Sequence, residues 1–231
     1  MDKLLLMLQL QNQLNNATNG EEWVKGMTKN GKEINWKRCI YMESAEMIDS
    51  FPWKHWKAID AEPDWENLKI EVVDVWHFIM SLAIEFYVQE MLGGIEDIAI
   101  HATELESFSL INNNNARFEE QKVIMKKVED IMRDVLSLQK LDLDALLRHF
   151  FELVSMSGLN LHSLYLLYIG KNVLNQFRQD NGYKEGTYVK TWNGEEDNVW
   201  MQKLLAKNPD IKPNELYKEL TKLYHQVNKG Q

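Results

Sequence analysis

The chain has 231 residues, of which 45% are hydrophobic, so it is long and apolar enough to bury a full core. Its 26 basic and 35 acidic residues give a formal net charge of -9, which argues against a broad nucleic-acid-binding surface. One cysteine, Cys39, excludes an intrachain disulfide framework and a cysteine-based zinc site, and this usage is typical of a reducing cytoplasm.

Apolar residues recur at spacings of three and four along most of the chain, which contains only 4 prolines and 11 glycines. This pattern predicts an all-α fold in the form of a multi-helix bundle. In chain order, we expect helices at roughly 3–16, 36–50, 66–92, 95–109, 117–137, 142–155, 158–179, 197–206 and 213–227. Residues 1–231 are expected to form a single domain.

Neither of the two most apolar runs is typical of a membrane protein. The opening run, MDKLLLMLQLQNQLNN, has one lysine and no small-residue cleavage pattern, so we expect a helix and no signal peptide. Residues 72–92 contain Asp74, His77, Glu85 and Glu90, too many ionisable groups for a span that faces lipid. We therefore expect no membrane partner and a cytoplasmic location.

Residues 180–198, DNGYKEGTYVKTWNGEEDN, show little helical period and are rich in glycine, tyrosine and lysine. A loop of this length in a compact protein is more often functional than idle. The segment is therefore expected to be a functional loop.

Two acid-x-x-acid pairs lie in otherwise apolar segments: Glu43 with Glu46, and Glu71 with Asp74. Residues three apart project from one face of a helix, so two such helices side by side would gather four carboxylates. Hard oxygen ligands of this kind suit Mg2+ or Mn2+. The spacing alone is weak evidence in a chain with 35 acidic residues, and it is the apolar surroundings that favour a metal site, because an unpaired charge is costly there.

The same carboxylates leave a second metal site open, a di-iron helical bundle. The segment DVWH supplies one carboxylate-x-x-His motif, whereas such bundles normally need two. By contrast, FEEQKVIMKKVEDIMRD mixes both signs of charge in the manner of a solvated helix face, and its acids are assigned no role.

Four segments then carry a resemblance to a known family: LQNQLN, ESAEMIDSFPWKHWK, EVVDVWHF and GKNVLNQFRQDNGYKEGTYVKTWNGEEDN. They resemble the dimeric all-α dUTP pyrophosphatases, relatives of the MazG-like nucleotide pyrophosphohydrolases. DSFPWKHWK and NQFRQDNGY are the more specific parts, since the acid pairs are shared by the wider superfamily. The resemblance implies a homodimer of the all-α NTP pyrophosphohydrolase type. Its implied reaction is Mg2+-dependent conversion of dUTP to dUMP and pyrophosphate, and of dUDP to dUMP and phosphate, which limits uracil in DNA.

The resemblance also implies roles for individual residues. A carboxylate cage of Glu43, Glu46, Glu71 and Asp74 would hold Mg2+, with Mn2+ as a substitute, and Glu46 would also take a proton from the attacking water; a role for Glu46 as a ligand alone stays open. The implied substrate contacts are Gln11, Asn15, Trp56, Phe78, Lys171, Asn175, Arg178, Tyr183, Lys184 and Lys190.

These substrate contacts differ in kind. Gln11 and Asn15 lie four apart, on one helix face, and would read the uracil edge, although neighbouring amides leave their register open. Trp56 would form a wall beside the base or sugar, whereas Trp53 is expected in the core. Arg178 and Lys184 would contact phosphates, and Asp197 would orient a cation or cap the following helix.

Two other functions stay open at this point. One is a MazG-like pyrophosphohydrolase acting on another nucleotide, such as dCTP. The other is a catalytically silent helical partner protein that keeps the fold.

Overall fold

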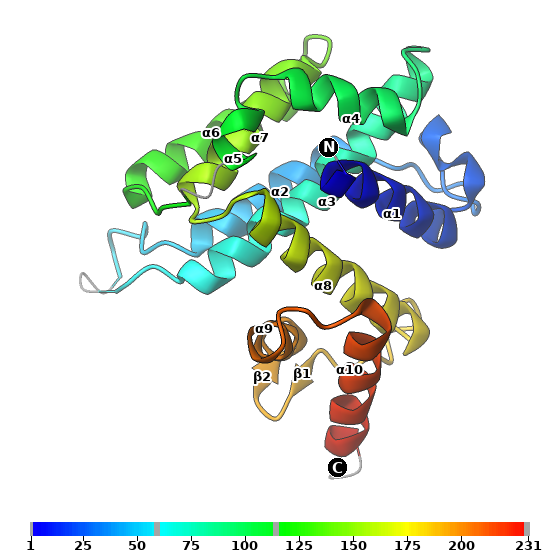
Figure 1. The fold of residues 1–231 in the computed structure, drawn as a ribbon, viewed down its shortest axis with the longest axis vertical. Coiled ribbons are helices and arrows are strands. Elements are labelled where there is room, and N and C mark those ends of the chain that lie inside the picture. The colour runs from blue at the N-terminus through cyan, green and yellow to red at the C-terminus, as the bar shows by residue number, and fades with distance from the viewer. Residues whose placement is uncertain (1, 58–60, 113–115, 229–231) are drawn as a thin grey trace. The chain divides into compact units, whose positions relative to one another are not determined.

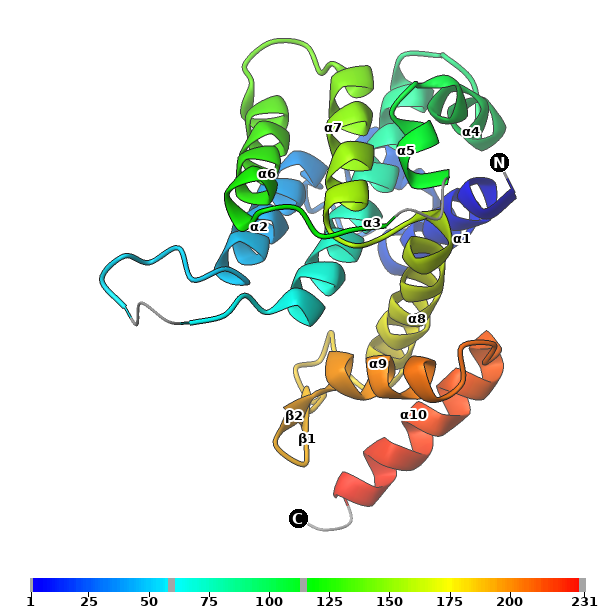
Figure 2. The same cartoon turned by 60° about the vertical axis from the view of Figure 1, so that its left-hand side comes forward.

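The computed structural model describes residues 2–57, 61–112 and 116–228. Apart from one two-stranded hairpin, its regular elements are helices, which confirms the all-α prediction (Figures 1 and 2). The chain divides into two compact units, residues 1–164 and 165–231, which are described in turn. Within the described ranges, no helix has both the length and the apolar character needed to cross a membrane.

The first unit is built around one long helix. Its elements are α1 (Asp2–Asn19), the 3-10 helix η1 (Glu21–Lys25), α2 (Trp36–Asp49), α3 (Trp65–Gln89), α4 (Ile95–Glu104), α5 (Phe108–Asn112), α6 (Gln121–Leu136), α7 (Leu143–Met156) and the start of α8 (Leu161–Asp180). α3 packs against α1, α2, α4 and α7 (Figure 1). Because neighbours cover it on several sides, α3 is apolar almost all round, as a central helix should be. Trp76 of α3 stacks on Phe150 of α7 with ring centroids 4.7 Å apart.

Three helices of this unit begin at a polar side chain. Asn35, Asp64 and Asp142 precede α2, α3 and α7, and each accepts a hydrogen bond of 2.9 Å from the backbone N–H three residues later. Such caps satisfy an N–H group that has no partner within the helix. They fix where α2 and α3 begin, and hence the faces on which their acids lie.

The segment between α2 and α3 is tied at its two ends. The backbone N–H of Asp64 donates to the carbonyl of Ser50 at 2.8 Å, and the Asn67 amide donates to the Ser50 hydroxyl at 2.9 Å. Both ends of this loop, which carries Trp53 and Trp56, are therefore held beside the α2–α3 pair.

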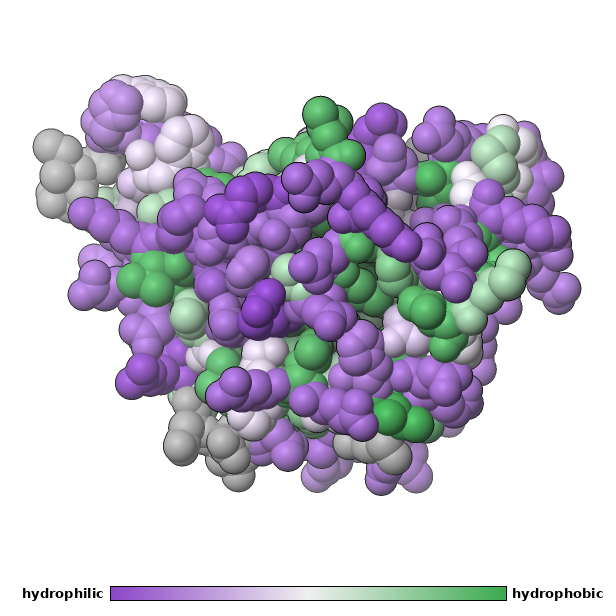
Figure 3. Space-filling view, turned by 90° about the horizontal axis from the view of Figure 1, so that it is seen from above, coloured by the Kyte–Doolittle hydropathy of each residue, from purple (hydrophilic) through white to green (hydrophobic). Residues whose placement is uncertain are grey.

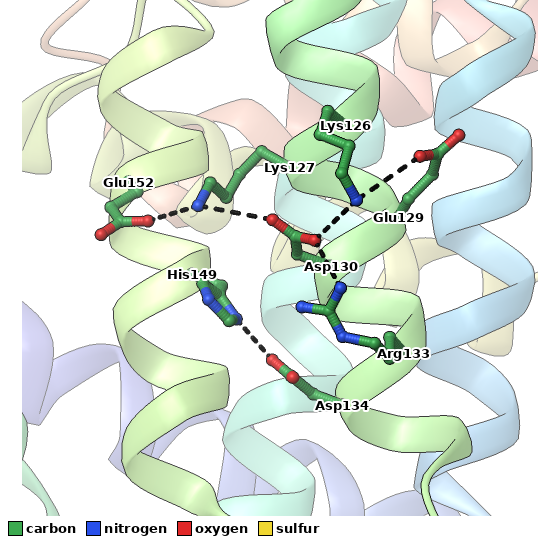
Figure 4. A network of polar contacts seen from close by, with 8 residues as sticks. All are labelled: Lys126, Lys127, Glu129, Asp130, Arg133, Asp134, His149 and Glu152. Atoms are coloured by element: carbon green, nitrogen blue, oxygen red, sulfur yellow. Dashed lines mark hydrogen bonds and ion pairs between the residues drawn. The ribbon is translucent and has the colours of Figure 1, made fainter.

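A network of charged side chains joins α6 to α7 (Figure 4). Asp130 binds Lys126 at 3.0 Å and Arg133 at 2.9 Å, and Lys127 bridges to Glu152 of α7 at 2.6 Å. Nearby, the Asp134 carboxylate contacts His149 of α7 at 2.6 Å. Acids and bases alternate here, which is the mixed face that the sequence predicts.

The second unit contains the rest of α8, β1 (Thr191–Trp192), β2 (Glu195–Glu196), α9 (Asp197–Lys207) and α10 (Pro213–Asn228). Its core is aromatic: Phe177 packs edge-on against Trp192 and Tyr224 at centroid distances of 5.9 and 5.5 Å. Gly170 allows α8 and α9 to approach closely, since an added Cβ would lie 2.8 Å from a methyl of Leu205.

The structure corrects several predicted elements. The segment 180–198 contains a hairpin, whose turn residues Asn193 and Gly194 have φ values of 50° and 84°, and Asn-Gly is a strong hairpin signal. The predicted helix at 95–109 is two helices, α4 and α5, because Leu105 is extended. The helix predicted from 117 begins at Gln121, since the residues before it pair with the backbone at the end of α7, where the Glu119 N–H donates to the carbonyl of Met156. The 3-10 helix η1 was not predicted.

The surface follows the usual distribution of polarity. Figure 3 shows hydrophilic residues over most of the face seen from above, with hydrophobic residues scattered among them. Met91 and Leu138 are the most exposed large hydrophobic side chains of the described residues, at 92% and 105%. Single exposed hydrophobic residues are normal and indicate no site by themselves.

Candidate active site

Three carboxylates converge where α2 packs against α3. Glu43 and Glu46 lie one turn apart on α2, and Glu71 lies on α3; one oxygen from each lies within 4.8 Å of the other two. Glu43 and Glu71 are half-buried and Glu46 is exposed, so the group opens to solvent. Carboxylate oxygens at this spacing are ligands that Mg2+ and Mn2+ prefer. The donor set therefore fits a divalent cation.

Asp74, the fourth acid of the predicted cage, is not part of this close group within the described residues. It lies three residues after Glu71 on α3 and is half-buried. Three residues of helix correspond to a rise of about 4.5 Å, so Asp74 lies one turn along α3 from Glu71.

The apolar residues around the acids have a structural explanation. Val72, Val73 and Val75 of α3 are buried, as is Met47 of α2, and the two helices pack against each other. Rigid packing of the helices therefore sets the spacing of the carboxylates.

The predicted uracil-reading amides form a buried cluster between α1 and α3. Gln11 and Asn15 are only 3% and 4% exposed, and their amide nitrogens donate to the Ser81 hydroxyl at 3.0 and 2.9 Å. The Gln11 amide oxygen faces Nδ1 of His77 at 2.7 Å. Gln11 and Asn15 thus share one face, as their spacing of four predicts.

Sequence reasoning missed Ser81 in this cluster. The sequence does contain an indication of it, since Ser81 follows His77 by four residues in an otherwise apolar helix and therefore lies on the same helix face. A small polar residue in such a run points to a buried hydrogen-bond partner.

The tryptophan loop is more exposed than expected. Trp56 is 63% exposed and packs edge-on against Trp53 at 5.6 Å. Trp53 is 42% exposed, so the expectation that it belongs to the core is wrong. Its indole N–H instead donates to Asp49 at the end of α2, at 2.7 Å, because the loop turns back over that helix end. Asp49 also binds Lys54 at 2.7 Å, and this contact, with the Trp53 bond, lowers the pKa of Asp49.

Phe78 lies beside the amide cluster on α3 and is half-buried. Its ring stacks on Trp36, the first residue of α2, with centroids 6.0 Å apart. Trp36 in turn meets Trp23 edge-on at 5.6 Å. Phe78 therefore belongs to an aromatic row, and part of its ring stays accessible.

In the second unit, Arg178 is held by a carboxylate. Its guanidinium donates to both oxygens of Asp197, at 2.8 and 2.7 Å, and Asp197 is fully buried. Asp197 therefore orients this cation, which was one of its two expected roles. Tyr188 donates to the same carboxylate at 2.8 Å, and burial together with this acid raises the pKa of Tyr188.

The other expected contacts of this unit fall into two groups. Lys171 and Asn175 adjoin the buried pair: Lys171 donates to Asn198 at 3.0 Å, and Arg178 donates to Asn175 at 3.2 Å. Tyr183, Lys184 and Lys190 are exposed. Sequence reasoning assigned no contact to Asn198, whose side-chain oxygen also accepts from Arg178 at 3.3 Å.

The chain is thus an all-α protein with three converging carboxylates between two packed helices, and these carboxylates are a donor set that fits a divalent cation. A model of the dUTPase family matches residues 3–183 of this chain, which covers every expected site residue except Lys184 and Lys190. The chain belongs to the dUTPase family, and it is an enzyme that hydrolyses dUTP. No curated protein matches the chain. The predicted family is thereby confirmed, while the homodimer and the relation to MazG stay predictions.

Proposed function

We propose that the enzyme converts dUTP to dUMP and pyrophosphate, and dUDP to dUMP and phosphate, in a Mg2+-dependent reaction that limits uracil in DNA. The observation that carries the proposal is the convergence of Glu43, Glu46 and Glu71 within 4.8 Å in a chain of the dUTPase family. Three carboxylates this close repel one another unless a cation or a proton balances them. Mn2+ is the substitute ion that the same oxygen ligands would accept.

The position of each acid suggests its proposed role as a metal ligand. Glu43 and Glu71, from two different helices, would hold the ion together with Glu46, and Asp74 would complete the set from the next turn of α3. When bound, Mg2+ would neutralise charge that develops on the phosphates.

Glu46 is the exposed member of the group, so it can meet a water molecule beside the substrate. Its carboxylate takes a proton as the water oxygen forms a new bond to phosphorus. The anhydride P–O bond breaks, and the leaving phosphate group keeps the electron pair.

Substrate contacts are proposed in each unit. In the first, Gln11 and Asn15 would read the uracil edge, Phe78 would line the sugar, and Trp56 would cover the nucleotide. Their support is a buried amide cluster beside an aromatic row and an exposed indole. In the second, the proposed contacts are Lys171, Asn175, Arg178, Tyr183, Lys184 and Lys190. A guanidinium oriented by Asp197 supports the role of Arg178.

We keep three further predictions as part of this proposal. Residues 1–231 act as one nucleotide pyrophosphohydrolase domain whose loop near 180–198 is functional, the enzyme is a homodimer, and it works in the cytoplasm without a nucleic-acid partner. The net charge of -9 supports the last point. Sedimentation of the purified protein tests the dimer, and a monomer at assay concentration would remove it.

A substrate panel tests the reaction. Purified protein is given dUTP, dUDP, UTP, dCTP or dTTP, with and without Mg2+, and phosphate products are measured. Turnover of dUTP and dUDP alone, only with Mg2+, supports the proposal. Preference for dCTP would contradict the proposed substrate and favour a MazG-like enzyme that acts on another nucleotide. Equal turnover in EDTA would contradict the proposed Mg2+ dependence.

A further inference from the structure

Helix α10 carries none of the predicted site residues, and it lies beyond residue 183, where the match to the dUTPase family ends. Within the second unit it packs against α9 and β1 (Figure 2). Its residues Tyr217 and Tyr224 lie seven positions, or about two turns, apart and so share one helix face. Both rings pack edge-on against Phe177, at centroid distances of 5.4 and 5.5 Å. The same two tyrosines also hold the segment 180–198, which is called the loop below.

The two tyrosines contact the loop at different points. At its start, the Tyr217 hydroxyl donates to the Asp180 carboxylate at 2.8 Å. In its middle, the backbone N–H of Val189 donates to the Tyr224 hydroxyl at 3.2 Å. The Tyr224 ring also stacks on Tyr188, with centroids 5.3 Å apart and an angle of 18° between the rings. Tyr224 is only 6% exposed, so it makes these contacts from inside the unit.

Tyr188 links Tyr224 to two of the proposed substrate contacts. Its ring centroid lies 6.0 Å from that of Tyr183. Its hydroxyl donates at 2.8 Å to Asp197, the carboxylate that orients Arg178. A side chain that packs against Tyr188 therefore acts on both positions.

The tip of the loop is a small exposed turn. It closes where the Thr187 N–H donates to the carbonyl of Gly182 at 3.0 Å, and it carries the exposed residues Tyr183 and Lys184. Such a turn keeps one position only as far as its base is held. Each conformation that cannot bind substrate lowers the apparent affinity in proportion to its population.

We propose that Tyr224 is a positioning residue for nucleotide binding, because it holds Tyr188 and, through it, the part of the loop that carries Tyr183 and Lys184. The inference rests on the proposed role of these loop residues as substrate contacts. Tyr224 is itself buried and acts on the nucleotide through Tyr188.

Three variants of the full chain test the inference. Tyr224→Leu removes the stacked ring and the hydroxyl, whereas Tyr224→Phe keeps the ring and loses only the acceptor for Val189. The control is Tyr168→Phe, because Tyr168 is fully buried in the same unit and its hydroxyl accepts from Asn172, on its own helix, at 3.4 Å. For each folded protein, kcat and KM are measured separately with dUTP.

We expect Tyr224→Leu to raise KM by about tenfold and to keep kcat within about threefold, since a loop in place for about a tenth of the time binds about ten times more weakly. Tyr224→Phe should raise KM by about threefold, because one hydrogen bond is lost and the stack remains. Tyr168→Phe should keep KM within about twofold. An unchanged KM in Tyr224→Leu, or an equal rise in Tyr168→Phe, overturns the inference. A loss confined to kcat also overturns it, since a smaller folded fraction would produce that result.

Limited proteolysis examines the loop without any substrate. Trypsin should cleave Tyr224→Leu faster than the parent after Lys184, relative to cleavage after Lys140 in the exposed segment between α6 and α7. Mass spectrometry of the fragments measures the two rates. An unchanged relative rate overturns the inference, because the loop is then held without Tyr224.

A further variant, Tyr183→Ala, separates this inference from the proposed function on which it rests. If Tyr183→Ala raises KM and Tyr224→Leu does not, the inference about Tyr224 fails alone. If both variants leave KM unchanged, the proposed contact between Tyr183 and the nucleotide fails together with the inference.

Discussion

The acids between α2 and α3 and the acids between α6 and α7 lie in the same unit, each between a pair of packed helices, yet their arrangements differ. Glu43, Glu46 and Glu71 converge on one another within 4.8 Å. Asp130 and Glu152 converge instead on lysines and an arginine at 2.6–3.0 Å. Like charges gathered by rigid helices call for an external cation, whereas alternating charges balance themselves. The spatial arrangement of positive and negative side chains therefore distinguishes a candidate metal site from a structural ion-pair network.

The largest expected effect is on activity. Glu46→Gln should lower kcat by about 100-fold or more, because it removes both a proposed ligand and the proposed base. Glu129→Gln is the matched control, an exposed glutamate of the α6 network, and should keep kcat within about twofold. Steady-state kinetics with dUTP measure both. An equal loss of kcat in the two variants would contradict the assignment of catalysis to the acids between α2 and α3.

Mg2+ should stabilise the folded protein through the acids between α2 and α3 and not through those between α6 and α7. At a free Mg2+ concentration of about 100 times its Kd, the free energy of unfolding should rise by about 2.7 kcal/mol. Glu71→Gln should reduce this gain, and Asp130→Asn should retain it. Urea unfolding with EDTA or Mg2+ measures the gain, and an equal response in both variants would contradict the assignment of the ligands.

Glu85 provides a third case, a carboxyl with neither like nor opposite neighbours in hydrogen-bonding contact among the described residues. Burial raises the pKa of Glu85 from 4.5 to about 7, while the charge of Lys37 acts in the other direction. Since the folded pKa is raised, the stability that this group contributes is full below pH 4.5 and is lost as the pH rises through about 7.

Glu85→Gln should therefore be more stable than the parent at pH 8, by about 1–2 kcal/mol after allowance for partial exposure, and should show no gain at pH 4.5. Urea unfolding at the two pH values checks this. Glu96→Gln, at an exposed position, is the control and should follow the parent. A gain of the same size at both pH values would show that ionisation is not its cause.

The smallest expected effect lies in the α6–α7 network. Burial acts to raise the pKa of Asp130, but the hydrogen bond from Lys126 and the charges of Lys126, Arg133 and Lys127 bring it below 3.8. A lowered folded pKa means stability that is present at neutral pH and is lost as the pH falls through the folded pKa. Asp130→Asn should cost about 1 kcal/mol at pH 7 and less near pH 3, as urea unfolding would show. A cost that is constant with pH would exclude the ion pairs as its source.

Part of the site could be predicted from the sequence because helical spacing carries it. Glu43 with Glu46, and Gln11 with Asn15, each share a face, since residues three and four apart do so in any helix. Asp74 met the same spacing rule but lies outside the close group, because spacing fixes a face and not the distance to another helix. The partners of Arg178 and Trp53 depended likewise on where distant segments fold back.

The sequence by itself determined that this chain is helical, that its acids are paired on helix faces, and that it resembles the dUTPase family. These properties follow from local period and from motifs read along the chain. Only the tertiary structure decided that Glu71 reaches Glu43 and Glu46, and that Ser81 joins Gln11 and Asn15. The physical reason is that helix packing sets distances between residues far apart in sequence, and both charge repulsion and hydrogen bonding depend on those distances.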